Sequence, residues 1–111
     1  MGDDFYCEQV LSGRTRVRKI IETDTVLAFE HTRPAYKVHF VVIPKRHVRS
    51  LIDLGDGDDQ LLLDVMSVVR QVAAAVKDEH GACRVVTNMG RYQESQHWHV
   101  HALSGEPLAT P

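Results

Sequence analysis

Histidine is the residue type whose spacing in this chain most directly suggests chemistry. The sequence contains seven histidines, and three of them alternate with other residues at His97, His99 and His101. Successive side chains of a strand point to opposite faces, so a strand here would project all three imidazoles from one face. A fourth, His39, interrupts an apolar run and is a candidate to join them. Imidazole has an ordinary pKa of about 6.5, so near neutral pH it serves as nucleophile, base or metal ligand.

Three interpretations of the histidine row remain open. A solvated strand face is the simplest one for a single histidine, but strict alternation of three argues against it. Three imidazoles can ligate zinc and leave a position for water, as in a zinc-dependent hydrolase. Alternatively, one neutral imidazole attacks phosphorus while its neighbours position the phosphate. Glu94 is the only nearby acid to orient ligating imidazoles, which makes zinc the weaker of these two.

The elements that position these residues predict an α+β fold. Runs rich in β-branched and aromatic residues indicate five strands, at residues 15–22, 25–30, 37–43, 83–87 and 97–103. Between the third and fourth, apolar residues recur at helical spacing from Asp58 to His80, and Gly81 follows. We therefore expect a mainly antiparallel sheet of about five strands, with one long helix covering one face. Trp98 and Val100 fit the core-facing side of the last strand.

Composition indicates a single domain over residues 1–111, with a flexible tail at 106–111. The net charge of −2 and the lack of a dense basic cluster argue against binding of duplex nucleic acid. The apolar runs are too short for a membrane helix, and the acidic N-terminus is unlike a secretory signal, so we expect a cytoplasmic protein. Two cysteines outside any Cys-x-x-Cys pair predict reduced thiols.

Several segments resemble the histidine triad (HIT) family. Residues 97–103 (HWHVHAL) are similar to its His-x-His-x-His-x-x signature with hydrophobic x positions. The resemblance extends, in the family's order, to residues 25–29 (TVLAF), 38–47 (VHFVVIPKRH) and 84–90 (RVVTNMG). Together these segments cover the chain from about Glu22 to Gly105.

This resemblance implies a HIT-like fold and a nucleotidyl hydrolase or transferase that acts on phosphoramidate or dinucleoside-polyphosphate bonds. It makes His99 the nucleophile that forms a covalent nucleotidyl-histidine, with His101 contacting the phosphoryl oxygens and His97 and His39 orienting the site. It also implies substrate contacts from Asn88, Ser95, Phe29 and Val10. The expected partners are a small purine nucleotide and a second copy of the chain, and no cofactor is expected. The alternative is a nucleotide-binding module with little turnover.

The chain departs from the family pattern at three places. Glu94 stands where the better-known branch has a hydroxyl, and Ser95 follows one place late. His31 stands where that branch has an acidic residue for the ribose hydroxyls. Some members hold a structural zinc with a Cys-x-x-Cys and two histidines. This chain has Cys7, His47 and His97 but Val10 in place of the second cysteine, which predicts no structural zinc and makes His47 a loop residue.

The long helix is apolar over more than one narrow stripe. Leu61, Leu62 and Leu63 are consecutive, and Val68 adjoins Val69, so not all of them can face one sheet. This surplus predicts a two-fold homodimer in which the helix packs against its symmetry mate. The alternative is that residues 5–11 cover it.

Overall fold

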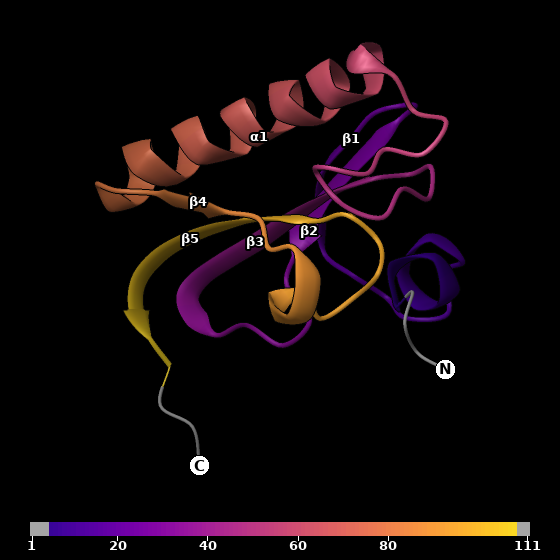
Figure 1. Ribbon diagram of the computed structural model, residues 1–111. Helices are drawn as coiled ribbons and strands as arrows, with labels where there is room; N and C mark the ends of the chain where they lie inside the picture. Colours follow the sequence, from indigo (N-terminus) through magenta and orange to yellow (C-terminus); the bar gives the residue numbers. More distant parts are fainter. Residues whose placement is uncertain (1–4, 109–111) are drawn as a thin grey trace.

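The computed structural model describes residues 5–108, which form one antiparallel sheet and one long helix (Figure 1). The sheet order is β1-β2-β3-β5-β4. This confirms the expected α+β class and the five-stranded sheet. The strands are β1 (Lys19–Glu22), β2 (Val26–Glu30), β3 (Tyr36–Pro44), β4 (Arg84–Val86) and β5 (Val100–Pro107). The helical elements are a short π-helix η1 (Tyr6–Leu11), the helix α1 (Asp59–His80) and a 3-10 turn η2 (Gly90–Tyr92).

The helix α1 begins and ends where the sequence predicts. The side chain of its N-cap, Asp58, accepts a hydrogen bond from the backbone N–H of Leu61. Gly81 ends the helix at φ 89°, a left-handed conformation that glycine adopts without strain. In the described part of the chain, no helix combines the length and apolarity needed to cross a membrane.

The sheet separates two apolar clusters. On one face, α1 packs against alternate residues of the central strands and buries a stripe at three- and four-residue spacing. On the other face, Tyr6 and Val10 of η1 pack against Leu27, Phe29 and Val41. Figure 1 shows η1, in indigo, on the side of the sheet away from α1. The alternative that residues 5–11 cover the surplus apolar surface of α1 is therefore wrong, because they cover the opposite face of the sheet.

The last strand differs most from its predicted bounds. It begins at Val100, three residues after His97, and extends to Pro107, which pairs with Tyr36. The segment before Val100 is bonded to the loop after β3 instead of to a strand, since the backbone N–H of Trp98 donates to the carbonyl of Val48 at 2.7 Å. The first two residues of the predicted flexible tail lie in β5, and residues 109–111 lie outside the described part. The first strand is also shorter, at Lys19–Glu22, and β4 covers only Arg84–Val86.

Trp98 packs in the apolar cluster between α1 and the sheet. Its side chain has no exposed surface, belongs to the cluster under α1, and donates from its indole nitrogen to the Thr87 hydroxyl at 3.1 Å.

We expect Trp98→Ala to lower the free energy of unfolding by about 3–5 kcal/mol, the range for large aromatic side chains lost from a core. Urea denaturation followed by circular dichroism measures the change. Ile52→Ala is the control, because a side chain that is 79% exposed should change stability by no more than about 0.5 kcal/mol. Equal losses in the two variants would contradict this assignment.

Candidate active site

The predicted histidine row exists, although only its last member lies in a regular strand. His101 is in β5 between Val41 of β3 and Val86 of β4, and His97 and His99 precede the strand. The two-residue alternation nevertheless holds through the segment. Trp98, Val100 and Ala102 belong to the cluster under α1, while the histidine rings lie on the other face beneath Tyr6. The row is less open than the sequence suggests, since His97 has no exposed surface and His99 is 4% exposed.

Hydrogen bonds to the backbone assign the tautomer of His99. Its Nδ1 lies 2.8 Å from the carbonyl oxygen of His97. A carbonyl only accepts, so the proton is on Nδ1 and the neutral ring carries its lone pair on Nε2. The ring lies 4.9 Å from the ring of His101 and 5.0 Å from that of Tyr6, measured between centroids. Neutral His99 therefore carries its lone pair on Nε2, and its ring lies near the rings of His101 and Tyr6.

A chain of hydrogen bonds likewise assigns His39 and His101. The backbone N–H of Ala35 donates to Nδ1 of His39 at 2.9 Å, which leaves the proton of neutral His39 on Nε2. That Nε2–H donates to Nδ1 of His101, also at 2.9 Å. Neutral His101 consequently carries its proton on Nε2, where it can donate to an oxygen of a ligand. His39 of β3 therefore lies beside the histidine row, which it was a candidate to join.

Burial keeps these imidazoles neutral. Loss of hydration lowers the pKa of His39 to about 4, with a smaller contribution from His31. Burial also lowers the pKa of His101 to about 3, and the neighbouring imidazoles act in the same direction. The pKa of His99 is lowered mainly by burial, against the opposing effects of its bond to the His97 carbonyl and of Glu94. Near neutral pH these three imidazoles are therefore uncharged donors and acceptors.

Two cavities lie near the row, and among the triad histidines only His101 lines one of them. One has a volume of about 260 Å³, and its walls include the aromatic rings of Phe5, Tyr6 and Phe29. The other, of about 290 Å³, contains His39 and His101. His31, Arg33 and Glu94 line both, so the cavities adjoin. A larger hollow of about 490 Å³ near the end of β5 is lined by no histidine, so it lacks the chemistry of the site.

The four predicted substrate contacts have different surroundings. Phe29 and Ser95 line the cavity with the aromatic walls, and Asn88 lines the one that contains His101. Val10 lines neither, because its side chain is buried in the apolar cluster between η1 and the sheet. The hydroxyl of Ser95 accepts a long bond of 3.4 Å from the backbone N–H of His97.

Sequence reasoning missed the contribution of η1. Phe5 and Tyr6 form a wall of the aromatic cavity, and burial raises the pKa of Tyr6, which keeps its hydroxyl protonated. A possible signal was the five-residue separation of Phe5 from Val10, but such a short π-helix has no repeating helical period to detect. Arg33 was also missed, because it lies in the turn between β2 and β3 and reaches the site only through the fold.

Two groups of side chains in residues 5–108 have the spacing of metal ligands. In one, His31, His39 and His101 place ligand atoms within 4.8 Å of one another. The lone pair of His39 is directed to the Ala35 N–H and its proton to His101, which is a hydrogen-bonding arrangement. The three triad histidines do not form such a group in this part of the chain, so the geometry does not support the zinc-hydrolase alternative.

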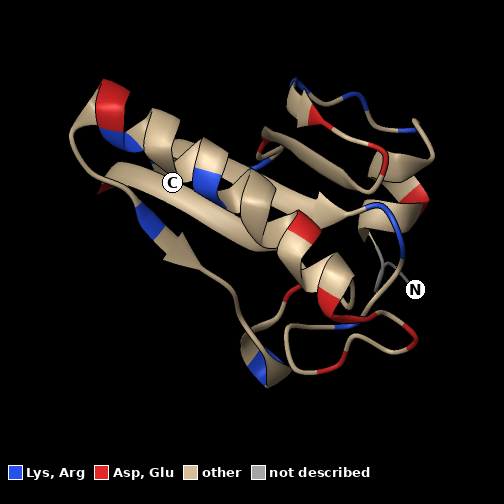
Figure 2. Cartoon of the chain, turned by 90° about the horizontal axis from the view of Figure 1, so that it is seen from above, with Lys and Arg blue, Asp and Glu red and all other residues tan. Residues whose placement is uncertain are grey.

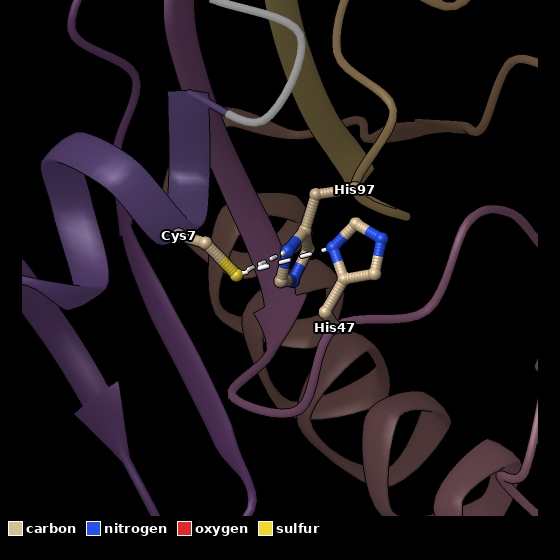
Figure 3. A group of neighbouring side chains, drawn as sticks. All are labelled: Cys7, His47 and His97. Atoms are coloured by element: carbon tan, nitrogen blue, oxygen red, sulfur yellow. Dashed lines mark hydrogen bonds between the residues drawn. The ribbon is translucent and has the colours of Figure 1, made fainter.

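The second group consists of Cys7, His47 and His97 (Figure 3). In some members of the histidine triad family, which the sequence resembles, four positions hold a structural zinc, and these residues stand at three of them. The fourth, Val10, is an aliphatic side chain with no donor atom. The described residues thus do not supply the closed four-ligand set of a structural zinc site. His47 lies in the loop after β3, as expected, yet its ring is beside the other two side chains.

Comparison with known proteins identifies the family and supports the fold. Residues 13–108 match the HIT domain. An uncharacterized HIT-like protein of Chlamydia trachomatis is 32% identical over 105 residues, covering 93% of this chain and 94% of that protein. A histidine triad protein of Clostridium difficile has a TM-score of 0.78 at 31% identity, with 100% of this chain and 97% of that chain covered. A HIT family hydrolase of Legionella pneumophila has a TM-score of 0.78 at 28% identity, with 97% of each covered.

The antiparallel sheet, its single covering helix and the alternating imidazoles define a histidine-triad fold. The chain belongs to the HIT family, which confirms the resemblance carried by its motifs.

The hydrogen-bond network predicts the tautomers and the protonation of three histidines. At neutral pH we expect His99 as the Nδ1–H tautomer, and His39 and His101 as Nε2–H tautomers. Because each pKa is lowered, each ring should stay neutral as the pH falls through the ordinary value of about 6.5, and gain a proton only at lower pH. Imidazole nitrogen chemical shifts followed through a pH titration report both properties. The opposite tautomer at His99, or titration of His101 at or above about 6.5, would contradict the network.

Proposed function

We propose that the protein is a nucleotidyl hydrolase or transferase in which His99 forms a covalent bond to the phosphorus of its substrate. One observation carries the proposal: the bond from Nδ1 of His99 to the carbonyl of His97, which leaves a lone pair on Nε2. Membership in the HIT family and likeness to a HIT family hydrolase support the same assignment. The lowered pKa of His99 keeps that lone pair available near neutral pH.

The reaction has two displacements at phosphorus. In the first, Nε2 of His99 bonds to phosphorus while the bond to the leaving group breaks, and the leaving group departs with the electron pair and takes up a proton. The phosphorylated ring is cationic, and its Nδ1–H to the His97 carbonyl stabilises that charge. In the second, water attacks the phosphorus and loses a proton. The nitrogen–phosphorus bond then breaks, which restores neutral His99 and releases a nucleoside monophosphate.

His101 and His39 assist without changing charge. In this mechanism the Nε2–H of His101 donates to a phosphoryl oxygen, where negative charge accumulates during displacement. His39 fixes this donor by its own bond to Nδ1 of His101, and the Ala35 N–H fixes His39 in turn. His39 is therefore a positioning residue and His101 a catalytic one.

The two cavities suggest how a purine nucleotide would bind. The aromatic walls at Phe5, Tyr6 and Phe29 suit a nucleoside, because aromatic faces stack on bases. The adjoining cavity has His101 and Asn88 for the phosphate, and Arg33 and Arg84 along its rim for an anionic leaving group. The substrate class proposed is a nucleoside phosphoramidate or a dinucleoside polyphosphate.

Intact-mass measurement tests the covalent step. Brief incubation of the wild type with an adenosine phosphoramidate should add one nucleoside monophosphate to the protein. His99→Ala should show no adduct, and its turnover should fall by about 10³-fold or more, as when other catalytic nucleophiles are removed. His80→Ala is the matched control, since His80 ends α1 and this helix covers the opposite face of the sheet.

Two results would reject the covalent mechanism. Turnover equal in the wild type and in His99→Ala would show that His99 is not the nucleophile. Binding of adenosine or guanosine monophosphate in calorimetry, without turnover across a panel of substrates, would favour the nucleotide-binding module instead.

We also propose that the protein is a homodimer. Leu63 of α1 is 62% exposed and Val85 of β4 is 45% exposed, although both are apolar. Figure 2, which looks onto α1, shows charged positions separated by uncharged stretches along that helix. Since η1 covers the other face of the sheet, nothing in residues 5–108 covers Leu63, and a symmetry mate is the occupant that the helix pattern suggests.

Light scattering at micromolar concentration measures the assembly state. A dimer predicts about twice the chain mass of 12.5 kDa. Leu63→Lys should shift the mass towards that of one chain, because it places a charge in the buried interface. The matched control is Gln71→Lys, a change of charge at an exposed polar position of the same helix. A wild-type mass near 12.5 kDa would reject the dimer.

A further inference from the structure

Glu94 is the one acidic side chain among the described residues that line the two cavities of the site, and it lines both. It lies in the segment before His97. Burial raises the pKa of Tyr6 and lowers that of His99, and the charge of Glu94 acts on both rings in the direction of a higher pKa. The carboxylate therefore lies near the proposed nucleophile. The side chain is also exposed, so it exchanges protons directly with bulk water.

In-line displacement decides on which side of the phosphorus a base is needed. In the second displacement the bond that breaks joins phosphorus to His99, so water enters on the side opposite that ring. The leaving group departs from this same side in the first displacement. In the proposed binding mode, that side is the cavity that contains His101 and Asn88, and Glu94 lines it. The proton that the water loses is thus released into this cavity.

Hydrogen bonds already use the lone pair of each imidazole that lines this cavity. Nδ1 of His39 accepts from the N–H of Ala35, and Nδ1 of His101 accepts from His39. Nδ1 of His31 accepts from the backbone N–H of Arg33 at 3.0 Å. Burial also lowers the pKa of all three rings, which opposes uptake of a second proton. None of these neutral imidazoles therefore has an unused lone pair for the proton of water.

The other polar side chains of this cavity are poorer proton acceptors than a carboxylate. Arg33 and Arg84 carry guanidinium groups, which only donate. The amide of Asn88 and the hydroxyl of Tyr36 are weak bases. Glu94, as an exposed carboxylate near neutral pH, accepts at both oxygens. Among the described side chains of the cavity, it is the group suited to receive the proton.

We propose that Glu94 is the general base of the second displacement, the step that removes the nucleotidyl group from His99. Its carboxylate takes a proton from the attacking water while the water oxygen bonds to phosphorus. The nitrogen–phosphorus bond breaks, and its electron pair returns to Nε2 of His99. The protonated carboxyl then releases its proton to bulk water. This inference rests on the proposed function, because it assigns a residue to one step of that reaction.

A substrate whose leaving group needs no proton separates the two displacements. Adenosine 5′-(4-nitrophenyl phosphate) is mixed with excess protein, so that each substrate molecule reacts once. Release of coloured nitrophenolate measures the first displacement, and decay of the adduct in intact-mass spectra of quenched samples measures the second. Glu94→Gln should release nitrophenolate at the wild-type rate but lose the adduct about 100-fold more slowly, the lower end of the usual effect of a general base.

Three further variants distinguish a base from a structural residue. Formate should restore part of the adduct decay in Glu94→Ala, because it supplies a carboxylate in the vacated space, and should leave the wild type unchanged. Glu94→Asp keeps a carboxylate and should decay faster than Glu94→Gln. Asp78→Asn is the matched control, because it makes the same carboxylate-to-amide change at an exposed position of α1, which covers the other face of the sheet. Its adduct should decay at the wild-type rate.

The outcomes separate the role of Glu94 from the proposed function. Adduct decay at the wild-type rate in Glu94→Gln, or equal slowing of both displacements, would overturn the role of Glu94 and leave His99 as the nucleophile. A slow Glu94→Ala that formate does not accelerate would do the same. Absence of any adduct in both the wild type and Glu94→Gln would reject the covalent step, and the role of Glu94 with it.

Discussion

The segment from His97 to Ala102 supplies side chains to both the core and the candidate site. Which side chain enters which is set by the two-residue period of an extended chain. From His97 to Ala102, alternate side chains enter the cluster under α1 or the row beneath Tyr6. A slip of one residue would place imidazoles under the helix and Trp98 among the histidines. Burial of Trp98 against α1 therefore fixes the register of the row. The register of this segment thus determines both the packing of the core on one face and the positions of the histidines on the other.

Elements with a long repeating pattern could be predicted from sequence. The apolar spacing and terminal residues of α1 identify it within a residue of its bounds, and β2 and β3 are similarly close. The histidine row follows from the same two-residue period, even though the regular strand begins only at Val100. The side-chain period extends beyond the strand because the backbone before Val100 remains bonded, to Val48 instead of to β3.

Features set by contacts between distant segments could not be predicted. The ring of His97 is buried and donates to the carbonyl of Pro44, 53 residues earlier in the chain. The aromatic wall depends on where η1 folds, and six residues of π-helix carry no periodic signal. Val10 was expected to contact the substrate because of its position in the family pattern, but Tyr6 of the same π-helix lines the cavity instead. Residue types identify the chemistry, whereas long-range contacts decide which atoms face it.

The tautomers of the site are set mainly by backbone atoms. His99 donates to the carbonyl of His97, and His97 to that of Pro44, while His39 accepts from the N–H of Ala35. Every residue type at those three partner positions would supply the same carbonyl, and all but proline the same N–H. The direction of each imidazole is therefore insulated from most changes in neighbouring side chains. Because their partners are main-chain atoms, these histidines can keep the same tautomers, with the same nitrogen unprotonated, when neighbouring side chains are substituted.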